Sequence, residues 1–567
     1  MDRRSFFSFT AGALLSEKLL AGQSAATGQA AKLRYARERT GSGPFLDGNH
    51  GNQPHILLIS ADMVGPDLYH PARSLSQHVR IPAIRSLMQD GTFFSNAFCT
   101  VPLCAPSRAS YLTGRYSYVQ GNNERAPEGL ETELRPDDII FPEYLKAAGY
   151  VTRQVGKCHV GAKKFLDAFG DNDQPWDRWS PPVFDDDGFL AYQRELGVKP
   201  QKYAREIVFR AQDRTTPGNS AGGWIVQEDG KPYPFEAQYS YYLGRKAIAA
   251  VENIAASDSL KRHPIYLQLD FFDPHQPFSI PAGFEDRERE LRQIMGCPDS
   301  WRAALQRDFK RAPDEPEIVD IYRRYWGVYD HEDLINYRVA YVLQMELVDR
   351  VIGMVLKRLK ELGLYDNMLV AFISDHGEMN GRRATVDKGV YLHPDIVRVP
   401  MIFKPPANMP RQHATVESPA SLLDLSQTIL AFAGIKPEGK FDGVSLLSAL
   451  QSGHGSEERT ILFFGGWHVG VNFNCGIQRR AADGRRYLYS YNCTSQVDEL
   501  FDLDSEDAVN LVASPEHARI REDLIQSLST ALQADSRWAG YWAEFRIAHF
   551  SELPRIAGDM QLFAMPD

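Results

Sequence analysis

The sequence predicts an α/β fold, in which a mostly parallel sheet is covered by helices on both faces and a smaller antiparallel-sheet subdomain follows. Two observations favour this class. From about residue 54, patterns typical of strand, loop and helix alternate along the chain. Past about residue 455 the pattern changes to short alternating strands. A length of 567 residues suits two packed units, which we place at residues 50–452 and 455–567.

Three apolar runs are typical of buried parallel strands, and polar residues follow each of them. The runs lie at residues 55–60, 264–269 and 368–374. The residues that follow include Asp62, then Asp273 and His275, then Asp375 and His376. Open α/β sheets bind ligands at the carboxyl ends of their strands. We therefore expect these side chains to meet at one site.

The remaining elements follow from periodicity and turn residues. Residues 336–362 have apolar positions at helical spacing, and Gly363 predicts the end of that helix. Residues 162–262 show no strong periodicity and are interpreted as a long insertion over the pocket. Toward the C-terminus we expect a strand at 487–491 after an Asp-Gly turn, and a helix at 517–532.

Composition excludes several classes of protein. The chain is 43% hydrophobic and 24% charged, which is typical of a folded globular protein. A net charge of −10 without a long basic block argues against a nucleic-acid partner. No apolar run reaches about 18 residues, so stable membrane insertion is not expected. Of six cysteines, Cys475 and Cys493 flank a predicted hairpin and are either paired or buried thiols.

Residues 1–31 resemble a twin-arginine export signal. Arg3 and Arg4 precede a short apolar stretch and a run of small residues. Asp2, Glu17 and Lys18 depart from the usual pattern, and a disordered basic N-terminus is the alternative. The expected location is the periplasm or the exterior of the cell.

The most informative motif lies at residues 104–115, which read Cys-Ala-Pro-Ser-Arg-Ala-Ser-Tyr-Leu-Thr-Gly-Arg. Taken alone, Cys104 before a helix start, with Arg108 one turn on, indicates either a thiolate nucleophile or a buried core cysteine. No Cys/His or Ser/His/Asp order of an acyl-transfer enzyme accompanies it.

The motif resembles the signature of the type I sulfatases, which is matched at every fixed position. The resemblance implies an alkaline-phosphatase-like fold and a hydrolase of sulfate esters. It also implies that Cys104 is oxidised to formylglycine by a separate formylglycine-generating or sulfatase-maturating enzyme, and that the hydrated aldehyde is the nucleophile. The implied substrate is a sulfated small molecule or glycan.

A second family signature runs from Gly149 to His159. Lys157 and His159 are two residues apart, so on a strand they would share one face and could simply line a groove. The resemblance instead assigns both to contacts with the nucleophile and the sulfate group. It further assigns the sulfate and leaving-group oxygen to His275, in a Pro-His-x-Pro element, and a sulfate contact to Lys388. Asp273 either orients His275 or caps the turn.

The metal ligands implied by the resemblance are Asp62, Cys104, Asp375 and His376. Many sulfatases have two consecutive aspartates after the first strand and a later Asp-Asn pair, whereas this chain has Asp62-Met63 and Asp375-His376. The pattern is closer to the choline-sulfatase and phosphonate monoester hydrolase branch. Ca²⁺ is expected first, and an imidazole ligand makes Mn²⁺ the alternative.

Two other functions remain open from the sequence. A phosphonate monoester or phosphodiester hydrolase would use the same nucleophile. An exported protein that binds sulfated glycans without catalysis would keep Cys104 as a thiol. In addition, Trp176, Trp179 and Phe184 either form an aromatic platform for the substrate or pack against the protein.

Overall fold

The computed structural model divides the chain into two compact units, Met1–Arg34 and Tyr35–Asp567. It describes Tyr35–Arg37 and most of residues 53–550, with gaps at 118–133, 135–137, 170–175, 206–208, 212, 214, 217–222, 259–260, 410–413 and 493–496. The export signal and Cys493 lie outside the described residues, so both remain predictions. Within the described part of the chain, no helix has the length and apolar character that a membrane span requires.

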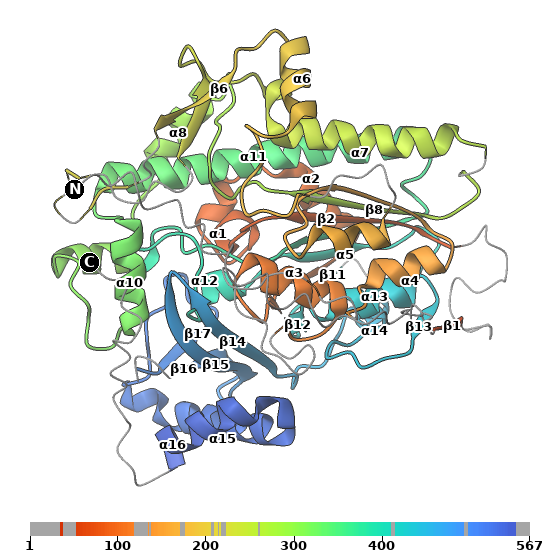
Figure 1. The fold of residues 1–567 in the computed structure, drawn as a ribbon. Coiled ribbons are helices and arrows are strands. Elements are labelled where there is room, and N and C mark those ends of the chain that lie inside the picture. The colour runs from red at the N-terminus through yellow and green to blue at the C-terminus, as the bar shows by residue number, and fades with distance from the viewer. Residues whose placement is uncertain are drawn as a thin grey trace, which may run out of the picture. The chain divides into compact units, whose positions relative to one another are not determined.

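A seven-stranded sheet forms the centre of the second unit (Figure 1). Four neighbouring strands are parallel, while β10 runs antiparallel to β9 and β3. The strands lie in the order β11 (Ala414–Val416), β3 (Thr92–Phe94), β10 (Met401–Lys404), β9 (Met368–Ser374), β2 (His55–Ala61), β8 (Ile265–Phe271) and β5 (Val151–Gly156).

Helices cover both faces of this sheet. Figure 1 shows one group above it: α2 (Pro82–Asp90), α7 (Tyr239–Ala256) and α11 (His331–Glu361). Below it lie α3 (Cys104–Thr113), α4 (Phe141–Ala147) and α13 (Asp424–Phe432). Strands β2 and β9 are buried almost along their whole length, as their continuous apolar sequences predict.

The C-terminal part contains a four-stranded antiparallel sheet in the order β14 (Ile461–His468), β15 (Gly470–Arg480), β16 (Arg486–Asn492) and β17 (Glu499–Asp502). Helix α15 (Ala518–Ala534) packs on β15 and β16, and α16 (Ala539–Phe550) packs on α15. The predicted α/β class with a C-terminal antiparallel sheet is therefore confirmed.

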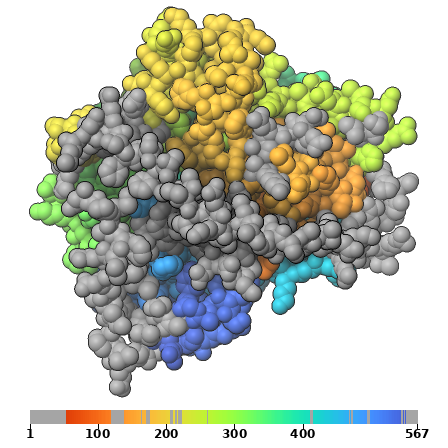
Figure 2. Space-filling view, viewed as in Figure 1, coloured from red at the N-terminus to blue at the C-terminus, as the bar shows by residue number. Residues whose placement is uncertain are grey.

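The other elements are short. The helices are α1 (Pro66–Tyr69), α5 (Ala162–Ala168), α6 (Asp187–Glu195), α8 (Glu285–Ile294), α9 (Asp299–Gln306), α10 (Glu317–Trp326), α12 (Pro394–Val397) and α14 (Leu447–Ser452). Three strand pairs complete the unit: β1 (Tyr35–Arg37) with β13 (Ile435–Pro437), β4 (Ala97–Phe98) with β12 (Ala420–Ser421), and β6 (Gln201–Arg205) with β7 (Trp224–Gln227). Segments around α6 and α15 both reach the surface on the face seen in Figure 2.

Two predicted elements differ from the structure. The long helix begins at His331 rather than 336, because the Asp330 side chain accepts a hydrogen bond from the Asp333 amide and caps the helix there. The predicted insertion at 162–262 extends too far. Its last part is helix α7, which packs on α11, β5 and β8 and so belongs to the helical layer over the sheet.

Candidate active site and metal centre

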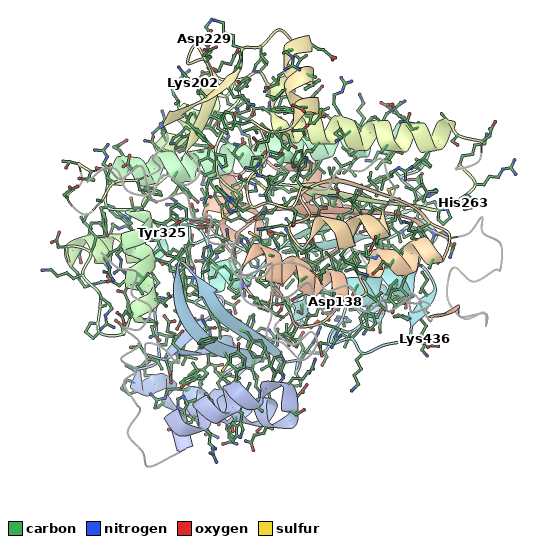
Figure 3. The ribbon with its side chains drawn as sticks, in the orientation of Figure 1. Asp138, Lys202, Asp229, His263, Tyr325 and Lys436 are labelled. Atoms are coloured by element: carbon green, nitrogen blue, oxygen red, sulfur yellow. The ribbon has the colours of Figure 1, made fainter. Side chains whose placement is uncertain are left out.

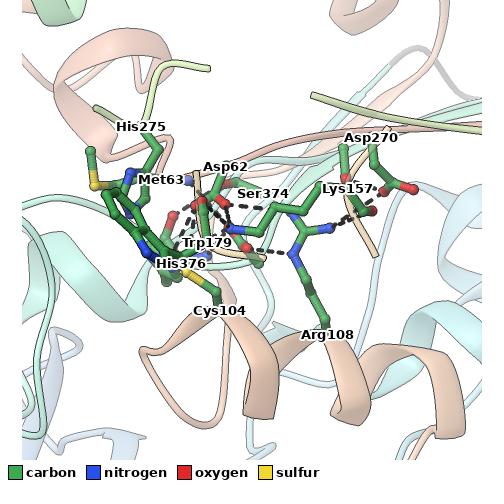
Figure 4. A network of polar contacts seen from close by, with 12 residues as sticks. Asp62, Met63, Cys104, Arg108, Lys157, Trp179, Asp270, His275, Ser374 and His376 are labelled. Carbon is green, nitrogen blue, oxygen red and sulfur yellow. Dashed lines mark hydrogen bonds and ion pairs between the residues drawn. The ribbon is translucent and has the colours of Figure 1, made fainter. Parts of the chain in front are cut away.

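Four adjacent parallel strands deliver polar side chains to one edge of the central sheet. Asp375 directly follows β9, Asp62 follows β2 and Lys157 follows β5, while His275 lies four residues past β8. The carboxyl ends of parallel strands meet at one edge, so these residues converge, as the sequence predicts (Figure 4). Charged residues elsewhere, such as Lys202, Asp229 and Lys436, lie exposed at the periphery (Figure 3).

Helix α3 carries the two predicted residues of the first signature. Cys104 is its first residue, and the Cys104 Sγ lies 3.0 Å from His376 Nε2 and 3.8 Å from Asp62 Oδ1. Arg108 is one turn later and therefore on the same face. Its Nε donates a hydrogen bond of 2.8 Å to Asp375 Oδ2. All of these side chains are buried.

Opposite charges offset one another in this buried cluster. Lys157 Nζ donates to an Asp62 oxygen and, at 3.0 Å, to the carbonyl of Trp179. Burial raises the pKa of Asp62, but the charges of Lys157, His376 and Arg108 outweigh it and lower the pKa to about 2. Burial lowers the pKa of Lys157, yet the Asp62 carboxylate raises it above its usual value. Both groups are therefore charged at neutral pH.

The chain leaves strand β5 through a tight bend at Gly156, which has a φ of +105°. A Cβ at this position would lie 1.9 Å from the Asp270 carbonyl oxygen, so glycine is required for Lys157 to reach Asp62. The alternative in which Lys157 and His159 merely line a groove on one strand face does not apply, because β5 ends at Gly156, before both residues, and His159 has a φ of 53°. His159 is nearly buried, and its contact with the nucleophile stays a prediction.

Asp62, Cys104, Asp375 and His376 form a compact set of potential metal ligands. One donor atom from each lies within 4.8 Å of the others, and all four residues are buried. His376 Nδ1 lies 2.9 Å from the Gly377 carbonyl, which orients the ring so that Nε2 faces Cys104. Two carboxylates and an imidazole are a donor set that suits a divalent cation. Met63 adds no side-chain oxygen, but its amide donates to Asp375 Oδ1 at 3.2 Å.

His275 and Lys388 lie in direct contact beside this cluster. The Gln276 carbonyl lies 2.7 Å from His275 Nδ1, so that nitrogen carries the proton and Nε2 accepts a 2.8 Å hydrogen bond from Lys388. Burial, followed by the charges of Lys388 and Lys157, holds the pKa of His275 well below its usual value. The imidazole is therefore neutral, with Lys388 as the charged partner.

Asp273 does not orient His275 by a direct hydrogen bond. It accepts a hydrogen bond from the Ser240 hydroxyl, while the backbone of Gln276 holds the imidazole. Burial, opposed by the Ser240 hydrogen bond and aided by the charge of Asp62, raises the pKa of Asp273 to about 7.

Of the three aromatic residues of the proposed platform, Trp176 pairs with Lys157 through its backbone, and Trp179 places its ring beside His275. Its ring centroid lies 5.7 Å from that of His275, and 39% of the residue is exposed although its neighbours in the cluster are buried. Phe184 pairs instead with Tyr203, at 5.2 Å between ring centroids. The three aromatic residues therefore have different surroundings.

Sequence reasoning assigned no role to two kinds of site residue. Asp270 follows the predicted strand at 264–269 and was recognised only as a polar residue at a strand end, yet its Oδ1 lies 3.6 Å from Arg108 NH1, inside the cluster. Asn472 and Asn474 contact the loop that follows Lys388. Their signal was two asparagines at alternate positions of an otherwise regular strand, where asparagine is depleted.

Comparison with known proteins identifies two families that the chain matches. Residues 54–435 match the family described as Sulfatase, and residues 381–534 match the family described as N-sulphoglucosamine sulphohydrolase, C-terminal. The chain is 27% identical over 374 residues to the uncharacterized sulfatase YidJ of Escherichia coli (strain K12), a match that spans 63% of each chain. It is 24% identical over 480 residues to the choline-sulfatase of Rhizobium meliloti (strain 1021), covering 82% of this chain and 83% of the relative.

Among solved structures, the phosphonate monoester hydrolase of Silicibacter pomeroyi superposes with a TM-score of 0.64 at 21% identity. The superposition covers 86% of this chain and 96% of that one. This likeness establishes the alkaline-phosphatase-like fold. Because the Sulfatase model matches most of the chain, the protein belongs to the sulfatase family.

Proposed function

We propose that the protein hydrolyses sulfate monoesters with a nucleophile formed from Cys104. The observation that carries the proposal is the position of Cys104 at the start of α3, in contact with His376 and Asp62. Arg108 contacts the buried carboxylate of Asp375, and Lys157 contacts that of Asp62. A nucleophile beside fixed positive charges suits an anionic ester, whose negative charge must be offset in the transition state.

Two groups that the chain acquires would complete the site. Formylglycine at position 104 supplies a hydrated aldehyde, whose hydroxyl can attack sulfur. A divalent ion, Ca²⁺ or Mn²⁺, supplies Lewis-acid stabilisation of that hydroxyl and of the sulfate oxygens. Asp62, Asp375 and His376, together with residue 104, would hold the ion, because their donor atoms already converge.

The chain's own cations bind and orient the sulfate group. Arg108, Lys157 and Lys388 converge from α3, the end of β5 and the loop before α12. Their attachment to buried acceptors, Arg108 on Asp375 and Lys157 on Asp62, limits reorganisation during the reaction.

We assign protonation of the leaving alkoxide to Lys388. His275 Nε2 accepts a hydrogen bond from Lys388, so the ammonium group rather than the neutral imidazole holds the transferable proton on this side. His275 then orients the Lys388 ammonium group, because the Gln276 carbonyl fixes the imidazole ring. The hydrated aldehyde has two hydroxyls, one of which would carry the sulfate group after attack. To His159 we assign removal of the proton from the other hydroxyl, so that the aldehyde C=O bond would re-form, the bond from that carbon to the sulfate oxygen would break, and sulfate would leave.

The nearest rival is a phosphonate monoester or phosphodiester hydrolase, favoured by Met63 and His376 in place of the common aspartate and asparagine. Steady-state kcat/KM for 4-nitrophenyl sulfate and for 4-nitrophenyl phenylphosphonate separates the two, because the leaving group is identical. We expect the sulfate ester to have the higher kcat/KM. A higher value for the phosphonate would overturn the assignment.

We further propose a sulfated small molecule or glycan as substrate, a separate maturating enzyme as partner, and export to the periplasm. The choline-sulfatase relative supports small sulfate esters, and the exposed Trp179 supports a leaving group with a ring. Sulfate release from a panel of sulfated sugars, aryl sulfates and choline sulfate would rank them. Release from none of the panel would contradict this substrate class.

A further inference from the structure

Val390, two residues after Lys388, forms hydrogen bonds through both its backbone amide and its backbone carbonyl. Its amide donates a 3.3 Å hydrogen bond to the Tyr322 hydroxyl, on α10. Its carbonyl accepts hydrogen bonds from Asn472 Nδ2 and Asn474 Nδ2, both of 2.7 Å, on β15 of the C-terminal sheet. A carbonyl oxygen has two lone pairs, so both bonds can form together. We call these two asparagines the β15 clamp.

Two buried asparagines are an unfavourable choice for the stability of a strand unless they have a role. Asn472 and Asn474 alternate along β15, so both point to one face of the strand, and both are fully buried. A buried amide is tolerated only when it is hydrogen-bonded, as both side-chain nitrogens are here, and asparagine is depleted in strands. Asn472 also donates to Asn492 Oδ1 at 3.0 Å, which extends the contact across the sheet.

A single residue, Gly389, separates Val390 from Lys388, and its backbone is closely packed. A Cβ on Gly389 would lie 2.5 Å from both Tyr322 Cζ and Tyr391 Cε1, so this backbone is packed between two rings. At the other end, the Lys388 ammonium contacts His275 Nε2 at 2.8 Å and Asp387 Oδ1 at 3.1 Å. The position of Val390 therefore limits where the ammonium group can lie.

We propose that Asn472 and Asn474 are positioning residues for leaving-group protonation, because they hold the backbone that carries Lys388. The C-terminal sheet is then a part of the catalytic apparatus rather than an appended subdomain. This inference rests on the proposed function, in which Lys388 is the proton donor.

The test replaces both residues in the full-length, matured enzyme as Asn472→Leu and Asn474→Leu, which keep the volume and remove the donors. We would measure kcat and KM for a series of aryl and alkyl sulfates that differ in leaving-group pKa. A misplaced acid should slow the poorest leaving groups roughly 10-fold or more, and 4-nitrophenyl sulfate hardly at all. Values of KM should stay nearly constant across the series.

The matched control is Gln478→Leu, on the same strand and equally buried. Gln478 donates to the Arg459 carbonyl at 3.1 Å and has no described contact with the Lys388 loop. We expect its leaving-group dependence to equal that of the unchanged enzyme. If the double leucine variant does not fold, Asn472→Ser and Asn474→Ser remove the same contacts, since serine is too short to reach Val390.

Lys388→Ala in the same series separates the two proposals. We expect the loss in rate to increase strongly with leaving-group pKa for Lys388→Ala and for the clamp variants. The Gln478→Leu control should show no such increase. A steep Lys388→Ala series beside a uniform loss in the clamp variants would overturn the clamp alone. A flat Lys388→Ala series would contradict the proton donor itself, and the clamp with it.

Discussion

The two halves of the site are held in different ways. The nucleophile side, which comprises Asp62, Cys104, Arg108, Asp375 and His376, is attached to strand ends and to the first turns of α3. The acid side, which comprises His275 and Lys388, lies on loops held by a backbone carbonyl and, through Val390, by the distant β15 clamp. This difference predicts two kinds of variant. Changes on the nucleophile side should slow every substrate alike, whereas changes on the acid side should depend on the leaving group.

The largest effect should come from Cys104→Ala. Without the side chain that becomes the nucleophile, kcat/KM should fall about 1,000-fold or more for every sulfate ester. Cys99→Ala is the control, because Cys99 is equally buried but its Sγ faces the Ile396 carbonyl. Residual activity of the Cys104 variant within tenfold of the unchanged enzyme would remove Cys104 from the mechanism.

Lys388→Ala should have the next largest effect, and a selective one. Loss of a general acid should lower kcat about 100-fold for alkyl sulfates, whose alkoxides leave poorly, and by less for 4-nitrophenyl sulfate. Rates across the leaving-group series measure this selectivity. Equal losses for all substrates would leave Lys388 with sulfate binding alone and would contradict its role as the proton donor.

His376→Ala should weaken metal binding on the nucleophile side by at least about 10-fold, because the variant loses a nitrogen ligand. Titration calorimetry with Ca²⁺ and with Mn²⁺ reports this without reference to activity. His70→Ala is the control, since His70 is also buried but its Nε2 contacts the Ser95 carbonyl. An unchanged affinity for both ions would exclude His376 as a ligand.

Trp179→Ala should give the smallest effect. An aromatic contact contributes about 1 kcal/mol, so KM for sulfates with a ring should rise roughly 5-fold with kcat little changed. A small alkyl sulfate should be unaffected. Phe184→Ala, which is similarly exposed but pairs with Tyr203, is the matched control. An equal rise in KM for substrates with and without a ring would instead indicate that the Trp179 side chain only positions the backbone carbonyl that contacts Lys157.

The nucleophile side was predictable from sequence because its residues are adjacent to strong local patterns. Asp62 and Asp375 follow apolar strands, and Cys104 and Arg108 are one helical turn apart. Parallel strands bring their carboxyl ends together regardless of loop detail. The central sheet was predictable from alternating strand and helix patterns, and the C-terminal antiparallel sheet from the change to short alternating strands.

The acid side was predictable in its members but not in its geometry. Outside both sides, strand alternation also gives no position for His159, because β5 already ends at Gly156, whose φ is +105°. Nothing local links Val390 to Asn472 and Asn474, which lie more than eighty residues later. Such contacts depend on tertiary packing and have no periodic signature in the sequence.

The most direct test of the account is the mass of the peptide that contains residue 104, measured on protein purified from its native host. The account predicts the mass of an aldehyde or its hydrate, since the proposed nucleophile requires oxidation of Cys104. The mass of an unmodified thiol in that material would contradict the account and favour a protein that binds sulfated ligands without cleaving them.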